Sequence, residues 1–166
     1  MKRKLSVFLI AVLIFSPAIG TNAETKKISQ SEIVVYTTEI GVEYNICPEL
    51  IQAIIERESN YNPNAKNGSC IGLMQVSEKW HTDRMEKLGV TDLYDPYSNI
   101  LVGTDYLAEL FNEAIENGRG DDLYYVLMRY NLKTSTANSR WDAGDYSDYA
   151  IAVSERAAEL ERENGK

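Results

Sequence analysis

The sequence predicts a mainly α-helical fold, and two observations carry this prediction. Apolar residues recur every three or four positions through most of the chain after residue 30, which is the spacing of one helical face. No segment alternates apolar and polar residues over the length of a long strand. With 166 residues and no internal repeat or low-complexity tract, the chain suits a single folded unit that follows an N-terminal segment.

The first two helices are expected on either side of Cys47. Ser31 is the expected N-cap of the first helix. The second begins at Pro48, because proline is tolerated in the first turn of a helix, and turn-forming residues from Asn60 to Gly68 end it. The residues that mark the first helix are Ile33, Val34, Thr37, Ile40 and Tyr44.

Three further helices are expected in the second half of the chain. One runs from Pro96 to about Glu116 and ends at the glycine-rich turn of residues 117–120. Asp121 or Asp122 caps the next, and a last helix follows near the end of the sequence. Small or apolar residues at helical spacing mark the three: Ile100, Gly103, Leu107, Leu110, Phe111 and Ala114; then Leu123, Leu127 and Tyr130; then Tyr149, Val153, Ala157 and Leu160.

The N-terminal segment has the pattern of a secretory signal peptide. Three cations at positions 2–4 precede an apolar run, and the segment ends in small residues at Ala23. We therefore expect residues 1–23 to be a cleaved signal peptide, residues 24–30 a short linker and residues 31–163 the domain. The alternative is an uncleaved membrane anchor. However, the apolar run is shorter than the roughly 20 residues of a spanning helix, and no cysteine follows it for lipid attachment.

Charge and composition exclude several classes of partner and cofactor. Cleavage after Ala23 would change the formal net charge from −8 to −11, so we expect no binding to nucleic acid or to an anionic membrane surface. His81 is the only histidine and is expected to be a partly exposed structural residue. The acidic cluster Asp142, Asp145 and Asp148 lacks the glycine and the closing glutamate of a calcium-binding EF-hand loop. We expect no metal and no other cofactor.

One acid, Glu58, is predicted to face the apolar side of its helix. The isoleucines that precede it by seven, four and three residues are Ile51, Ile54 and Ile55. This spacing places all four side chains on one face, whereas Glu49 and Glu56 fall on the opposite side, where we expect water to solvate them. Burial disfavours a carboxylate, so the pKa of Glu58 should lie above its ordinary value, as a proton donor requires. The alternative is a structural glutamate, paired with an arginine or exposed by fraying of the helix end.

Several short motifs follow Glu58 in a fixed order. They are Glu58-Ser59, Asn62-Pro63-Asn64-Ala65, Gly72-Leu73-Met74-Gln75, Asp95-Pro96, Asn99-Ile100, Gly103, Tyr106-Leu107 and Tyr130-Asn131. Together they resemble the soluble lytic transglycosylase (SLT) domain of the lysozyme-like superfamily. Each motif alone is weak evidence, but several in order, over roughly residues 45 to 135, are specific.

The resemblance implies a lysozyme-like helical domain with a cleft beside a catalytic glutamate. It also implies a secreted peptidoglycan lytic transglycosylase, which cleaves the MurNAc–GlcNAc bond and forms 1,6-anhydro-MurNAc ends. Glu58 is the implied catalytic residue, acting first as an acid and then as a base. The implied substrate-binding residues are Ser59, Gly72, Met74, Gln75, Tyr130 and Asn131.

Most of these residues also have a purely structural interpretation. Met74 suits the core, and Tyr130 continues an apolar helical face. Asn131 suits a helix C-cap, and Gly72 suits a tight turn. Gln75 is polar within an apolar run and is harder to explain by packing.

The sequence departs from the family pattern in two places. The loop between Pro63 and Gly72 is compact and contains a cysteine. Arg129 precedes the Tyr-Asn pair and Leu132-Lys133 follows it, where relatives often have alanine before and a small residue or glycine after. These departures bear on the subsites and the glycan preference more than on the cleavage of the bond.

Two cysteines, Cys47 and Cys70, flank the Glu58 helix and its loop. A bond between them would close a loop of roughly 24 residues and stabilise the fold by about 3 kcal/mol on a chain-entropy estimate. We expect this disulfide in an exported chain. The alternative is two independent, small apolar residues, because sequence alone does not show whether the two Cα atoms come within bonding range.

The residues leave three functions open, with the lytic transglycosylase favoured. A goose-type-lysozyme-like muramidase would use water in place of the sugar hydroxyl and leave reducing muramic ends. A non-catalytic peptidoglycan-binding or assembly protein would keep the cleft without cutting. The expected partners are peptidoglycan glycan strands and, by family analogy, a secretion, conjugation or phage assembly. We expect a monomer that is secreted or lies in the cell envelope, peripheral to the membrane at most.

Overall fold

The computed structural model describes residues 28–166, which form seven helices and three very short strands. The elements are α1 (Gln30–Tyr44), α2 (Pro48–Ser59), β1 (Lys66–Asn67), β2 (Cys70–Ile71), β3 (Val76–Ser77), α3 (Glu78–Leu88), α4 (Pro96–Glu116), α5 (Leu123–Asn131), α6 (Thr134–Asp142) and α7 (Asp148–Glu163). The strands pair antiparallel in the order β1-β2-β3. The mainly α prediction is confirmed, while the expected signal peptide lies outside the described residues.

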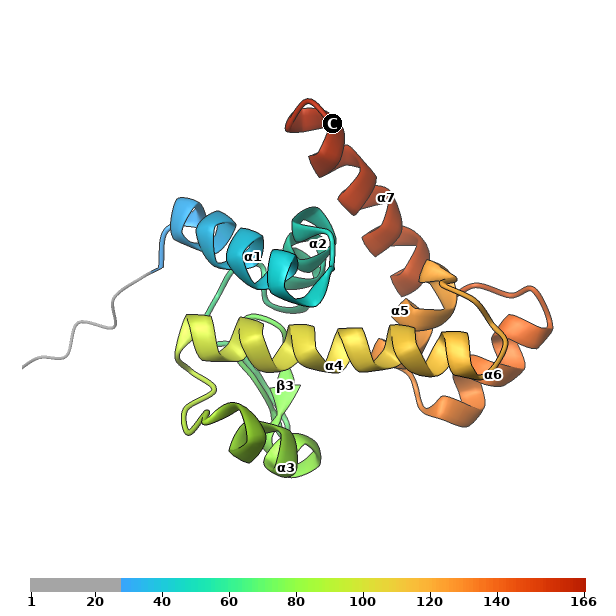
Figure 1. Cartoon of the computed structure of the whole chain (residues 1–166), viewed down its shortest axis with the longest axis horizontal. Helices are drawn as coiled ribbons and strands as arrows, with labels where there is room; N and C mark the ends of the chain where they lie inside the picture. The colour runs from blue at the N-terminus through green and yellow to red at the C-terminus, as the bar shows by residue number, and fades with distance from the viewer. Residues whose placement is uncertain (1–27) are drawn as a thin grey trace, which may run out of the picture.

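The long helix α4 crosses the middle of the molecule and organises the rest (Figure 1). Helices α1 and α2 lie on one side of it, α3 and the strands lie on the other, and α5, α6 and α7 gather at its C-terminal end. Helix α2 packs against both α1 and α7, and α5 packs against α4 and α7. Fully buried side chains of α2, α4 and α5, such as Ile54, Leu107 and Leu127, form the core. None of the helices within residues 28–166 is long and apolar enough to cross a membrane.

Helix ends follow the sequence signals closely. Pro48 begins α2, Asp95 caps α4 and Asp122 caps α5, where each aspartate side chain accepts a backbone N–H. The first helix is the exception: its N-cap is Ser29 and not Ser31. Ser29 and Glu32 form a reciprocal capping box, so the Ser-x-x-Glu spacing in the sequence carried the correct signal.

Two helices, α3 and α6, were not expected from the sequence. Each buries a single residue, Met85 in α3 and Ala137 in α6. A helix that buries so little has almost no apolar periodicity to detect. Most of the other residues of each helix are polar, although Leu88 and Trp141 also pack against the core.

The expectation that Glu49 is solvated is wrong. The Glu49 residue is only 2% exposed, because Lys166 Nζ and Asn164 Nδ2 each donate to its Oε1 at 2.8 Å. Burial alone would raise the pKa of Glu49, but the hydrogen bonds from Lys166, Asn164 and Cys47 lower it to about 2. Glu56, in contrast, is half-buried and pairs with Arg156 at 3.0 Å.

The expected Cys47–Cys70 disulfide is also wrong, because both cysteines are free. The Cys47 thiol lies at the start of α2 and donates to Glu49 at 3.1 Å and to Glu161 at 3.2 Å. Cys70 lies in β2, close to Tyr130 of α5, and the pKa of Tyr130 is raised by burial and also by both Glu58, at the far end of α2, and Cys70. The 12 residues of α2 span about 18 Å, so a thiol beside the Glu58 end of α2 is out of bonding range of Cys47 at its start.

Candidate active site

Glu58 lies in the last turn of α2 and is partly buried. The hydroxyl of Tyr149, in the first turn of α7, donates to Glu58 Oε1 at 2.6 Å. Burial raises the pKa of the Glu58 carboxyl, and the Tyr149 hydrogen bond and the charge of Arg57 offset only part of that effect. The predicted direction of the pKa shift is therefore confirmed, and the carboxyl holds its proton to a higher pH than an exposed glutamate.

Tyr149 was not expected to contact Glu58, because it lies 91 residues away in the sequence. It marks an apolar helical face together with Val153, and the sequence suggested core packing or stacking on a sugar ring for it, not a bond to Glu58. The residue is buried, and burial together with the negative charge of Glu58 raises its pKa well above the ordinary value. Tyr149 therefore stays protonated and remains a hydrogen-bond donor to Glu58.

Tyr130 connects Glu58 to the Gly72–Gln75 turn. Its hydroxyl donates to the backbone oxygen of Met74 at 2.9 Å. Burial raises the pKa of Tyr130 well above its ordinary value, and the charge of Glu58 is the next cause. The structure thus brings together Glu58, Tyr130 and the Gly-Leu-Met-Gln segment, which lie far apart in the sequence.

Asn99 holds the Gly72–Gln75 turn in place. Its Oδ1 accepts the Met74 N–H at 2.8 Å, while its Nδ2 donates to the carbonyl oxygens of Ile71 and Leu93. Gly72 has a φ of 77°, and an added Cβ would collide with the Asn99 side chain. Only glycine fits this position, so Gly72 has a structural reason to be there whatever else it does.

Met74 and Gln75 play different parts in the turn. The Met74 side chain is fully buried and packs on Gly103, and its N–H and carbonyl oxygen are already bonded to Asn99 and Tyr130, so Met74 supports the turn and does not line the cavity. Gln75 has a left-handed backbone, with a φ of 49°. Its Nε2 donates to the carbonyl oxygens of Gly72 at 2.9 Å and Ala65 at 3.2 Å. This polar side chain braces the turn while remaining partly exposed.

Two predicted site residues stand apart from this arrangement. The Ser59 hydroxyl donates to the Ile55 carbonyl of its own helix at 3.0 Å. Asn131 is exposed at the end of α5, where Leu132 and not Asn131 is the C-cap. Neither residue lines the adjacent cavity.

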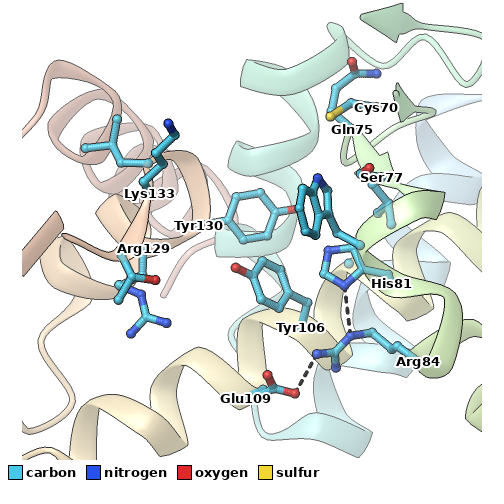
Figure 2. Close-up of a pocket in the computed structure, with 15 residues that line it drawn as sticks. Cys70, Gln75, Ser77, His81, Arg84, Tyr106, Glu109, Arg129, Tyr130 and Lys133 are labelled. Carbon is cyan, nitrogen blue, oxygen red and sulfur yellow. Dashed lines mark hydrogen bonds and ion pairs between the residues drawn. The ribbon is translucent and has the colours of Figure 1, made fainter. Parts of the chain in front are cut away.

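A cavity of about 690 Å³ opens beside the turn (Figure 2). Its lining comes from β2, β3, α3, α4, α5 and the start of α6, and comprises Cys70, Gln75, Val76, Ser77, Trp80, His81, Arg84, Gly103, Tyr106, Glu109, Arg129, Tyr130, Leu132, Lys133 and Thr134. Glu58 does not itself line the cavity. Tyr130 does line it, and is close enough to Glu58 that, besides burial, the charge of Glu58 raises the pKa of Tyr130.

One wall of the cavity is aromatic, and the sequence did not single it out. Trp80 is 73% exposed, and the rings of His81 and Tyr106 lie 4.6 Å apart. Tyr106 in turn lies 5.6 Å from Tyr130. Exposed aromatic faces are suited to stacking on sugar rings. The sequence signal that could have indicated this wall is the adjacent pair Trp80 and His81, in an otherwise polar segment before Arg84.

His81 is held neutral at the edge of this wall. Its Nδ1 accepts a hydrogen bond from Arg84 Nε at 3.3 Å. Burial lowers the pKa of His81, and the positive charge of Arg84 lowers it further. Arg84 also pairs with Asp105 and with Glu109.

One group of side chains has metal-ligating atoms close together. Within residues 28–166, the ligand atoms of Cys47, Glu49 and Glu161 lie within 4.8 Å of one another. Glu49 already accepts hydrogen bonds from Lys166 and Asn164, which accounts for its burial without an ion. The group lies at the start of α2, at the opposite end from Glu58.

The chain matches known proteins over most of its length. The model of the transglycosylase SLT domain family matches residues 36–150. The chain is 34% identical over 104 residues to a transglycosylase of Enterobacteria phage PRD1, which covers 62% of the chain and 35% of that protein. It is 32% identical over 93 residues to the membrane-bound lytic murein transglycosylase E of Buchnera aphidicola. That match covers 51% of the chain and 42% of that protein.

A longer match links the chain to the endo-type membrane-bound lytic murein transglycosylase A of Salmonella paratyphi B. The two are 31% identical over 125 residues, which covers 70% of the chain and 60% of that protein. The chain thus spans less than two thirds of the length of each of these relatives. Because the family model covers well over half of the residues and the expected motifs meet around Glu58, the chain belongs to the transglycosylase SLT domain family.

Proposed function

We propose that the chain is a peptidoglycan lytic transglycosylase that cleaves the bond between MurNAc and GlcNAc. The observation that carries the proposal is Glu58: a partly buried carboxyl with a raised pKa, fixed by Tyr149 next to Tyr130. The names of the relatives, two of them lytic murein transglycosylases, support the substrate and the reaction.

In the first step, protonated Glu58 donates its proton to the bridging glycosidic oxygen. The bond from C1 of MurNAc to that oxygen breaks, and the N-acetyl carbonyl of the same sugar stabilises the positive charge at C1. Glu58 becomes a carboxylate that still accepts the hydrogen bond from Tyr149. A group that donates a proton at neutral pH needs a pKa above that of an ordinary glutamate, which burial provides.

In the second step, the Glu58 carboxylate takes the proton of the C6 hydroxyl of the same MurNAc. The C6 oxygen attacks C1 and closes the 1,6-anhydro ring. Glu58 ends the cycle protonated, as it began, and no water is consumed. Tyr149 holds Oε1 throughout, which leaves Oε2 as the oxygen that exchanges the proton.

Within the part of the chain that the structure describes, the cavity beside the Gly72–Gln75 turn offers no unpaired carboxyl group to act together with Glu58. Most glycosidases use two carboxyl groups, one on each side of the bond. Among residues 28–166, the only carboxylate that lines the cavity is Glu109, and it is paired with Arg84 at 2.6 Å. The N-acetyl group of the substrate would therefore take the role of the second carboxylate.

Mass spectrometry of purified peptidoglycan digested with the protein tests the proposal. We expect fragments with 1,6-anhydro-MurNAc ends. Glu58→Gln should reduce their release by about 100-fold or more, since it removes the proton donor. Glu155→Gln, an exposed acid on α7, is the matched control and should cut like the wild type. Reducing muramic ends would indicate a hydrolase, and binding without any fragments would indicate a non-catalytic protein.

The place of action is also a proposal. We expect the protein to act on glycan strands in the cell envelope, in keeping with two relatives named as membrane-bound murein enzymes. A role in opening the wall for a phage, secretion or conjugation assembly stays a prediction. One relative, the transglycosylase of phage PRD1, is in keeping with the phage alternative. Fractionation of producing cells, with detection of the protein in the envelope or the medium, checks the location.

A further inference from the structure

The cavity beside the active site has the opposite charge to the chain as a whole. The chain carries a formal net charge of −8, yet the cavity is lined by three cations and one carboxylate. The cations are Arg84, Arg129 and Lys133, and the carboxylate is Glu109. Arg84 is compensated by Glu109 and Asp105. Arg129 is paired with Glu113, so the cation of the lining without an acidic partner among residues 28–166 is Lys133, on the other wall, at the start of α6.

Two cationic side chains of that wall have donor atoms without a hydrogen-bond partner among residues 28–166. Arg129 pairs with Glu113 at 2.7 Å and donates to the Tyr125 hydroxyl at 3.3 Å. Its side chain is nine-tenths buried, and its Nε alone has no hydrogen-bond partner within residues 28–166. Lys133 is exposed, and its ammonium group forms no ion pair or hydrogen bond in the same part of the chain. Figure 2 shows both residues across the cavity from Ser77 and His81.

Lys133 is also the N-cap of α6, and this position is unusual for a lysine. No side chain caps the first turn of α6, as in α2 and α3, whereas Ser29, Asp95, Asp122 and Ser147 cap theirs. The first N–H groups of a helix have no partner within the helix and carry a partial positive charge. A cation beside them is electrostatically unfavourable. An anion bound between them would remove that conflict.

Resting on the proposed function, we propose that Arg129, Lys133 and the first turn of α6 form an anion subsite that binds a carboxylate of the peptidoglycan. Thr134, the first residue of α6, lines the cavity, so the helix start and the lysine open on the same space. Peptidoglycan offers this chemistry from two sources. A stem peptide carries free carboxylates, and a muramic acid without a peptide exposes its lactyl carboxylate.

This subsite would set the choice of glycan and not the chemistry of cleavage. A lysine and a helix start together provide several donors and a positive field at one point of the cavity. Substrates whose carboxylates reach that point should bind more tightly.

The test compares glycan strands that differ only in their carboxylates. One set keeps its stem peptides, and a second is stripped of them by an amidase. Each is used as such and after conversion of its carboxyl groups to amides with carbodiimide and ammonia. The proteins are the wild type, Lys133→Met and the control Lys66→Met, which removes the same charge from exposed strand β1, outside the cavity.

We expect the wild type to cut the carboxylate form about three to ten times faster than the amide form at low salt. Lys133→Met should bring this ratio close to one, and Lys66→Met should keep it. Added salt should lower the wild-type ratio, because it screens exposed charges. A preference in the peptide-bearing set identifies the stem peptide as the source, and one in the stripped set identifies the lactyl group.

The inference is overturned if amidation leaves the wild-type rate unchanged or if Lys133→Met keeps the wild-type ratio. Should the wild type cut neither form, the proposed function fails, and co-sedimentation with native and amidated peptidoglycan decides the subsite separately. Binding that falls on amidation and in Lys133→Met supports it, and equal binding overturns it. Circular dichroism confirms that each variant is folded.

Discussion

The two ends of helix α2 each bury a glutamate, and their environments give them opposite properties. Glu49, at the start, accepts hydrogen bonds from Lys166, Asn164 and Cys47, and its pKa falls to about 2. Glu58, at the end, has the neutral hydroxyl of Tyr149 as its donor, and its pKa is raised. Burial is common to both. The difference shows that the partner decides whether a buried acid is a fixed charge or a proton donor.

The largest expected effect comes from removing the acid at the end of the helix. Glu58→Gln should reduce cleavage by about 100-fold or more and at the same time stabilise the fold at neutral pH. A raised pKa in the folded state means that the stability from Glu58 is complete below its unfolded pKa and is lost as the pH rises through its folded pKa. Thermal unfolding at neutral pH should therefore give a higher Tm for the variant. A lower Tm would mean that the Glu58 carboxylate stabilises the fold.

Removing the neutral donor should have the next largest effect. Tyr149→Phe deletes the hydrogen bond to Glu58 Oε1, and we expect activity to fall roughly 10- to 100-fold. This hydrogen bond lowers the pKa of Glu58, so its loss should raise that pKa further. Activity that depends on protonated Glu58 should then persist to higher pH. A pH–rate profile whose alkaline limb moves to lower pH would contradict this role of Tyr149.

The acid at the start of the helix should matter for stability and not for cleavage. Glu49→Gln should cost about 1–3 kcal/mol in the free energy of unfolding, because it removes charged hydrogen bonds inside the fold. The folded-state pKa is depressed, so this contribution is present above the unfolded value near 4.5 and is lost as the pH falls to about 2. Denaturant titrations at neutral pH and near pH 3 should show a gap between wild type and variant that narrows in acid. A constant gap would contradict the pairing.

The smallest effect concerns the thiol that donates to Glu49. Burial, followed by the hydrogen bond to Glu49, raises the pKa of Cys47 to about 11, so its alkylation should be slow. In Glu49→Gln the negative charge is gone, the pKa of the thiol should fall, and alkylation should accelerate. Mass spectrometry of the protein treated with iodoacetamide, without reductant, follows both cysteines. If the protein takes up no label even when it is unfolded, the two cysteines form a disulfide after all, and this account of Cys47 is contradicted.

Much of the fold was predictable because its signals are local. Asp95-Pro96 and Asn117-Gly118 mark the ends of α4, and the isoleucines before Glu58 placed that acid toward the core. The polar helices α3 and α6 gave no such signal, since each buries one residue. Periodicity detects a helix only where the helix covers the core.

The remaining features depend on contacts between distant parts of the chain. Glu49 was expected to be solvated because it lies on the outer side of its own helix. Asn164 and Lys166, which follow it by 115 and 117 positions in the sequence, cover it. Tyr149 likewise reaches Glu58, 91 positions away in the sequence, because α7 packs against α2. The disulfide was expected because a chain with the pattern of an exported protein has two cysteines that flank the Glu58 helix, but Cys47 lies at the start of α2 and Cys70 lies near Tyr130, beside the other end. Only the three-dimensional packing decides such contacts.

The most direct measurement of the central claim is the titration of the two carboxyl groups themselves. Carbon-13 NMR of protein labelled at the glutamate side-chain carboxyls, with Glu58→Gln and Glu49→Gln to assign the signals, gives both pKa values in one experiment. We predict that Glu58 titrates above the ordinary value of 4.5 and Glu49 at about 2. A Glu58 signal that titrates at or below 4.5 would contradict the account, because the proposed proton donor would then be a carboxylate at neutral pH.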